Sequence, residues 1–153
     1  MFETRIPPVV WLALGGLVTW GIGRLDLDGA PLDNRFGVLS GVLLAALGAA
    51  IAALGVVQFR QAQTTVNPHN IDGTSHLVTA GIYRITRNPM YLGMLVVLAG
   101  WAAVLGTIGG FIVGGGVFFA VVTRLQIIPE ERVLADKFGD TYARYTATVR
   151  RWI

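Results

Sequence analysis

Residues 88–123 read NPMYLGMLVVLAGWAAVLGTIGGFIVGGGVFFAVVT, a stretch of 36 residues without one Asp, Glu, Lys or Arg. A helix needs about 20 apolar residues to cross the roughly 30 Å hydrocarbon core of a bilayer. The stretch is too long for one crossing, and the glycine-rich sequence 106–110 interrupts it. It therefore predicts a hairpin of two membrane-spanning helices, at about 89–105 and 108–128.

Two further charge-free stretches cover residues 6–23 and 36–59. Each has the length of one crossing, so we expect spans at about 7–25 and 36–59. The composition agrees, because 54% of the 153 residues are hydrophobic and 14% are charged, against about 25% charged in a soluble domain. The sequence predicts one all-α domain over residues 1–153, an integral membrane bundle of four transmembrane helices followed by an amphipathic helical segment.

The composition also excludes several kinds of chemistry. The chain has no cysteine, which excludes a disulfide framework, a cysteine-based zinc site, an iron–sulfur cluster and a cysteine nucleophile. It has two histidines, too few for a histidine-rich metal site. The predicted spans carry no acidic residue, which argues against a proton-coupled exporter, because such a protein needs a buried carboxylate.

Lysine and arginine gather on one side of the predicted bundle. Ten of the twelve lie before the first span, in the loop 60–88, or from Arg124 onward; the connection between the first two spans carries the other two. The positive-inside rule then places both termini and the loop 60–88 in the cytoplasm. This bias accounts for the pI of about 9.8, so we expect membrane lipids as partners and no nucleic acid.

The segment 129–153 is expected to lie along the cytoplasmic membrane surface as an amphipathic helix. Pro129 suits the first turn of a helix, and Glu130 and Glu131 follow where the helix dipole favours acids. Gly139 is typical of a helix end, so a second short helix is expected from Asp140 to Arg151.

Small residues recur every four positions in the second span, and we expect them to pack against a neighbouring helix. Gly93, Gly100 and the run 114–116 are expected to do the same in the third and fourth spans. The set in the second span is Gly37, Gly41, Ala45, Ala49 and Ala53.

Four motifs lie in or beside the two cytoplasmic segments. They are Leu77-Val78 with Gly81 and Tyr83, then Arg87-Asn88-Pro89-Met90-Tyr91, then Glu130-Glu131, and finally Phe138-Gly139 with Tyr142. In this order and spacing they resemble the motifs of the isoprenylcysteine carboxyl methyltransferase and phospholipid methyltransferase superfamily of integral membrane enzymes, in its bacterial branch. Asn88 stands where the better-studied members have His. Because Asn cannot take up a proton, no acid–base role is expected for it.

The resemblance implies transfer of a methyl group from S-adenosylmethionine to a lipid-like or prenylated acceptor that enters from the bilayer. It implies catalytic roles for Arg87, Glu130 and Glu131, and no metal. Substrate contacts are expected at Arg124, Tyr142 and Arg144. The cofactor site that it implies is formed by His76, Leu77, Val78, Gly81, Tyr83, Arg87, Asn88, Pro89, Tyr91, Glu130 and Glu131.

The residue types suit this cofactor. A carboxylate can accept hydrogen bonds from ribose hydroxyls or from an ammonium group, and Arg87 can bind a carboxylate through two parallel bonds. The rings of Tyr83 and Tyr91 offer π-electron density to a sulfonium cation. Methyl transfer is an in-line displacement, so the enzyme's main task is alignment.

Other interpretations of the same residues stay open. Glu130 and Glu131 could cap a helix, Arg87 could anchor the chain at the membrane surface, and Arg124 could extend its charge to the interface. Two other functions also fit: an NADPH-dependent reductase of the steroid-reductase type, and a four-helix membrane module without enzymatic activity. The sequence does not distinguish a carboxylate, an amine and a thiol as methyl acceptor.

Overall fold

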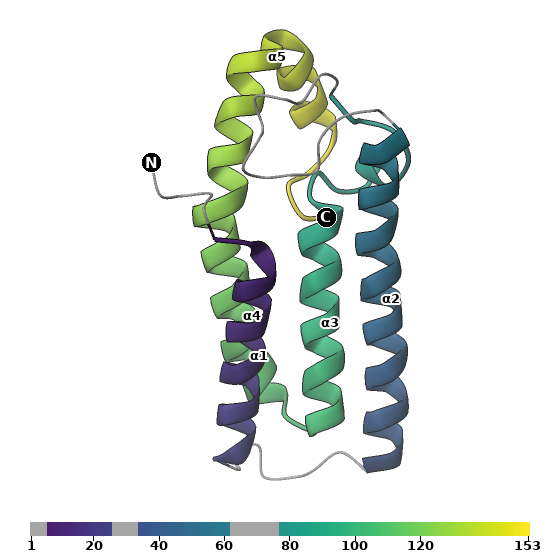
Figure 1. Ribbon diagram of the computed structural model, residues 1–153, viewed down its shortest axis with the longest axis vertical. Helices are drawn as coiled ribbons and strands as arrows, with labels where there is room; N and C mark the ends of the chain where they lie inside the picture. The colour runs from purple at the N-terminus through teal and green to yellow at the C-terminus, as the bar shows by residue number, and fades with distance from the viewer. Residues whose placement is uncertain (1–5, 26–33, 62–76) are drawn as a thin grey trace.

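The structure, a computed structural model, describes residues 6–25, 34–61 and 77–153, and these form helices and connecting turns without a β-strand. Figure 1 shows two pairs of long helices side by side, α1 with α4 and α2 with α3. The helices are α1 (Pro8–Arg24), α2 (Asn34–Gln61), the short 3₁₀ helix η2 (Gly81–Arg84), α3 (Pro89–Leu105), α4 (Ile108–Val122), the π-helical turn η3 (Thr123–Ile127) and α5 (Ile128–Thr148). The all-helical prediction is confirmed. His76 and most of the predicted loop 60–88 lie outside the described residues.

Two of the described helices are long and apolar enough to cross a membrane, Arg35–Gln61 and Ile108–Thr148, the second of which is bent at Gly139. α3 is apolar but has 17 residues, and α1 also has 17, slightly fewer than the about 20 of an untilted crossing. By length and composition, two of the predicted spans are therefore able to cross a membrane. The number of four spans and their orientation remain predictions.

Glycines bring α2 and α3 into backbone contact. A Cβ atom on Gly48 would stand 2.5 Å from the carbonyl oxygen of Gly93, and one on Gly41 would stand 2.6 Å from that of Gly100. Such distances are below any real Cβ contact, so only glycine allows this approach.

The predicted small-residue stripe of the second span is correct at its start and wrong at its end. Gly37 and Gly41 are buried, whereas Ala49 and Ala53 are exposed and Gly48 and Gly55 are buried instead. The reason is the helical period of 3.6 residues, which turns a four-residue repeat progressively away from the partner helix.

The break between α3 and α4 lies where the sequence predicts it. Gly106 ends α3 in the left-handed conformation, with φ of 69°, which glycine adopts without steric cost. Thr107 then caps α4, because its Oγ1 accepts a hydrogen bond of 2.9 Å from the backbone N–H of Gly110. This tight turn brings α4 back along α3.

A helix begins beside Pro129 as predicted, since α5 starts at Ile128, but this helix is not separate from α4. The helix that starts at Ile108 runs through the π-helical turn η3 into α5 as far as the break at Gly139. In a regular α-helix Pro129 would leave one hydrogen bond unmade, and its ring would clash with the carbonyl four residues earlier. The wider π-helical turn just before Pro129 makes room for the ring and for the missing hydrogen bond. The predicted break at Gly139 is confirmed, since its φ of 47° and ψ of −124° are not helical.

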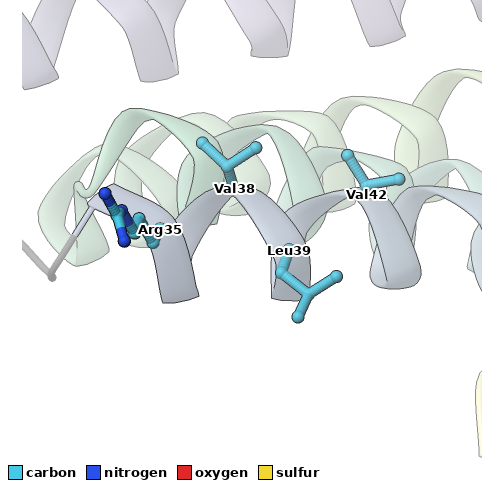
Figure 2. A pocket seen from close by; sticks show the side chains of 4 residues that line it. All are labelled: Arg35, Val38, Leu39 and Val42. Atoms are coloured by element: carbon cyan, nitrogen blue, oxygen red, sulfur yellow. The ribbon is translucent and has the colours of Figure 1, made fainter.

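An open hollow of about 460 Å³ lies on the outer face of α2 near its start (Figure 2). Its lining is apolar apart from one guanidinium group: Arg35, Val38, Leu39 and Val42. In Figure 1 this end of α2 is opposite the end that carries α5. The hollow therefore belongs to the exposed apolar surface of the bundle and not to the cluster of polar residues described below.

The close approach of α2 and α3 predicts opposite outcomes for two Gly-to-Ala variants. Gly48→Ala should destabilise the protein by about 1–3 kcal/mol, because its methyl group would overlap the α3 backbone. Gly116→Ala, whose added methyl group would meet nothing within 4 Å, should have no cost, since Ala favours a helix. Thermal unfolding in detergent measures both, and equal losses of stability would contradict the packing.

Candidate functional site

Three parts of the chain meet at the end of the bundle that carries α5, which we call the α5 end. They are the turn and first residues of α3 (86–91), the first turn of α5 (130–131) and the extended segment 149–153. The bend at Gly139 reverses α5, so the chain after Thr148 returns to the start of α3 (Figure 1). Residues far apart in the sequence are thereby brought into contact.

Tyr91 and Glu130 form a buried polar pair. The Tyr91 hydroxyl donates a hydrogen bond of 2.7 Å to Oε1 of Glu130, and Tyr91 is 5% exposed. Burial raises the pKa of the Glu130 carboxyl to about 7, the Tyr91 hydrogen bond opposes this rise, and the nearby charge of Glu131 adds to it. Glu130 thus changes protonation near neutral pH, at a place where the chain leaves the apolar bundle.

Glu131 is shared by two arginines. Its Oε1 lies 3.0 Å from Nη1 of Arg87, and Arg151 binds the same carboxylate through two bonds, 3.0 Å from Nε to Oε1 and 2.7 Å from Nη2 to Oε2. Arg87 also donates to the hydroxyl of Tyr142 at 3.5 Å. One negative charge therefore holds two positive ones, at the entry to α3 and on segment 149–153.

The backbone of segment 149–153 is fixed to the start of α3. The N–H of Arg87 donates to the carbonyl of Arg150 at 3.1 Å, and Nδ2 of Asn88 donates to the carbonyl of Arg151 at 2.9 Å. The Thr86 hydroxyl donates to the same carbonyl at 3.4 Å. Next along the chain, the ring of Trp152 stacks on Phe119 with 4.7 Å between the centroids. Arg87 and Asn88 therefore hold segment 149–153 in place, and Arg87 also forms an ion pair with Glu131.

Tyr83 lies on η2 beside this cluster. Its ring packs edge-on against Phe59 at 5.4 Å, and its carbonyl accepts a hydrogen bond of 2.7 Å from the Tyr145 hydroxyl. The Tyr83 hydroxyl is buried without a hydrogen-bond partner among the described residues, and burial raises its pKa. Gly81 begins η2 with φ of 58°, at a point where a Cβ would overlap the Gln58 side chain.

The structure brings together five of the predicted site residues through direct contacts: Arg87, Tyr91, Glu130, Glu131 and Tyr142. Pro89 is buried at the start of α3, and Leu77 and Val78 are half-buried before η2. Arg124 and Arg144, the other predicted substrate residues, have exposed side chains and take no part in these contacts. His76 lies outside the described residues.

Sequence reasoning missed Arg151, Thr86 and Tyr145. It gave Arg151 no role in the site, whereas Arg151 binds Glu131. Nothing in the local sequence could have indicated this pairing, because it depends on the bend at Gly139. The three-residue spacing of Tyr142 and Tyr145 was a signal, since it places both rings on one face of a helix.

The profile of the phospholipid methyltransferase family matches residues 36–141. The chain belongs to the phospholipid methyltransferase family. The match includes the Arg87-to-Tyr91 motif and both glutamates, and it ends before segment 149–153.

Two relatives were compared with the chain. The chain is 42% identical over 64 residues to an uncharacterized protein of Haemophilus influenzae. These 64 residues are 42% of this chain and all of that protein. The chain is 38% identical over 90 residues to methanethiol S-methyltransferase 1 of Bradyrhizobium diazoefficiens. This alignment covers 50% of this chain and 29% of that enzyme. This chain thus spans less than a third of that methyltransferase. The predicted membership of the superfamily is confirmed.

The raised pKa of Glu130 predicts a pH-dependent effect of Glu130→Gln on stability. The folded protein holds the Glu130 proton more tightly than the unfolded chain, so this carboxyl's contribution to stability is full below its ordinary pKa of 4.5 and is lost as pH rises through about 7. Gln imitates the protonated form. The variant should therefore lie within about 1 kcal/mol of the unchanged protein near pH 5 and be more stable by about 3 kcal/mol at pH 8.

Thermal unfolding at the two pH values measures this difference. Glu131→Gln is the matched control, and it should lower stability at both pH values because it removes two ion pairs. The same pH profile in Glu130→Gln and in the unchanged protein would contradict the raised pKa.

Proposed function

We propose that the protein transfers a methyl group from S-adenosylmethionine to an amphipathic acceptor at the membrane surface, with the α5 end on the cytoplasmic side. The observation that carries the proposal is the adjacent pair of glutamates at the α5 end. Glu130 is held by Tyr91 and Glu131 by Arg87. Family membership supports methyl transfer, and this cluster is where the matched motifs converge.

The residues of the α5 end fit this cofactor. S-adenosylmethionine carries a sulfonium-bound methyl group that an acceptor's lone pair can take while the sulfur keeps the bonding electrons. Glu130 is a carboxylate in a buried setting, where a cationic ligand group gains most from an ion pair. The Tyr83 hydroxyl and Nε of Arg87 are buried and lack hydrogen-bond partners among the described residues, so each can bind a polar ligand group.

Each side chain then has a separate task. Glu130 would accept hydrogen bonds from an ammonium group or from ribose hydroxyls. Arg87 would bind a ligand carboxylate through Nε while Nη1 stays on Glu131. Tyr83 and Tyr91 would present ring surfaces to a sulfonium cation. Together these contacts would fix the ligand's orientation, which contributes most of the rate in an in-line displacement.

The acceptor is proposed to be lipid-like or prenylated and to enter from the bilayer. The apolar helices Arg35–Gln61 and Ile108–Thr148 support this, because they would place the cluster where an amphipathic molecule's polar end lies. The likeness to methanethiol S-methyltransferase 1 supports including thiols among the acceptors tested. Tyr142, which contacts Arg87, is the proposed substrate residue nearest the cluster.

Ligand binding tests the proposed function. Purified protein in detergent is titrated by calorimetry with S-adenosylmethionine, S-adenosylhomocysteine and NADPH in parallel. Binding of the first two without NADPH is expected. Binding of NADPH alone would indicate a reductase, and the absence of binding by all three would favour a membrane module without enzymatic activity.

Arg87→Ala is predicted to weaken S-adenosylhomocysteine binding about tenfold or more, the effect of losing one charge-assisted hydrogen bond. The matched control is Arg84→Ala, because Arg84 lies three residues earlier and its side chain is exposed. Calorimetry with the same ligand measures both variants. If both variants bind S-adenosylhomocysteine with equal affinity, Arg87 does not contact the ligand.

A further inference from the structure

We propose that Arg151 is a positioning residue of the α5 end: it holds Glu131 and, through Glu131, the guanidinium of Arg87, so that segment 149–153 forms one wall of the site. This inference rests on the proposed function. It adds to the site a segment that the family profile, which ends at residue 141, does not cover.

The first argument is geometric. Nε of Arg151 and Nη1 of Arg87 each lie 3.0 Å from the same oxygen, Oε1 of Glu131. Arg151 also binds Oε2 at 2.7 Å, which makes its contact bidentate. A carboxylate held at both oxygens cannot rotate, so its Oε1 remains directed at Arg87.

The second argument concerns charge. If Arg87 alone faced Glu131, the two would neutralise each other, and little attraction would remain for a ligand carboxylate. With Arg151 present, two positive charges share one negative charge, and the trio keeps a net charge of one positive unit. The side chains of Arg87 and Glu131 are 15% and 17% exposed, so this charge is only partly screened by water.

The third argument concerns how Arg151 is itself held. Its carbonyl accepts hydrogen bonds from Asn88 at 2.9 Å and from Thr86 at 3.4 Å, while Val149 on one side is 8% exposed and Trp152 on the other stacks on Phe119. These contacts fix the backbone at Arg151 independently of its side chain. The guanidinium then loses little conformational entropy when it binds Glu131.

Affinity for S-adenosylhomocysteine tests the positioning role in a double-mutant cycle. Arg151→Gln should raise the Kd about tenfold, and Arg151→Lys, which keeps the charge without the two parallel bonds, should lie between it and the unchanged protein. Arg132→Gln, which removes an exposed arginine beside Glu131, should leave the Kd unchanged.

The decisive comparison uses Glu131→Gln as background. If Arg151 acts through Glu131, adding Arg151→Gln to Glu131→Gln should change the Kd little further. A full additional tenfold loss would show that Arg151 acts independently of Glu131, and it would overturn the inference. Only variants whose size-exclusion profiles match that of the unchanged protein are compared. If Arg151→Gln does not fold, Arg151→Lys takes its place in the cycle.

A second measurement needs no cofactor, so it separates failure of this inference from failure of the proposed function. The chain has no cysteine, which allows single-cysteine probes. Val149→Cys should react slowly with a maleimide reagent, and Arg151→Gln should accelerate that reaction several-fold by loosening the segment. Ala147→Cys, at an exposed position, should react fast in both backgrounds.

If Arg151→Gln leaves the maleimide rate of the Val149→Cys probe unchanged, the inference is overturned, even where S-adenosylmethionine binds. An accelerated rate in a protein that binds neither S-adenosylmethionine nor S-adenosylhomocysteine would show that Arg151 holds the segment. The same result would reject the proposed function and, with it, any role of Arg151 in cofactor binding.

Discussion

The carboxylate of Glu131 lies between two guanidinium groups, and the arrangement of the α5 end depends on it. Arg87 reaches it from the entry to α3, and Arg151 reaches it from the segment after α5. Removing Glu131 would leave two partly buried positive charges without compensation, which costs more than the ion pairs themselves contribute. The ion pairs therefore fix the relative positions of the two ends of the cluster.

Glu130, one residue earlier, has a different environment. Its partner is the neutral hydroxyl of Tyr91, and burial brings its pKa to about 7. Two adjacent carboxyls with such different surroundings have different protonation behaviour and suit different tasks. In our account Glu131 maintains the structure of the site, and Glu130 is the carboxyl that a cationic ligand group meets.

Much of the fold could be predicted from the sequence because charge distribution and glycine positions have direct structural consequences. The third helix occupies residues 89–105 as predicted, and both Gly106 and Gly139 end regular helix. The passage from α4 into α5 could not be predicted, because Pro129 is equally compatible with a new helix start and with a π turn. The packing face of α2 was only partly predicted, since a four-residue repeat does not follow the 3.6-residue helical period.

The site was predictable as far as local motifs extend. Arg87, Tyr91 and the two glutamates were identified from their motifs, and the structure places them in contact. Arg151 was not, because its role depends on the bend at Gly139 bringing the chain back to the start of α3. A basic residue near a membrane has many uses, and only the folded arrangement distinguishes an ion pair within a site from a lipid contact.

Photochemical cross-linking with radiolabelled S-adenosylmethionine, followed by peptide mapping, tests the central claim most directly. Our account predicts label on peptides that contain Tyr83, Tyr91 or the pair 130–131, and loss of the label with excess S-adenosylhomocysteine but not with NADPH. Label confined to the opposite end of the bundle, or label that NADPH displaces, would contradict it.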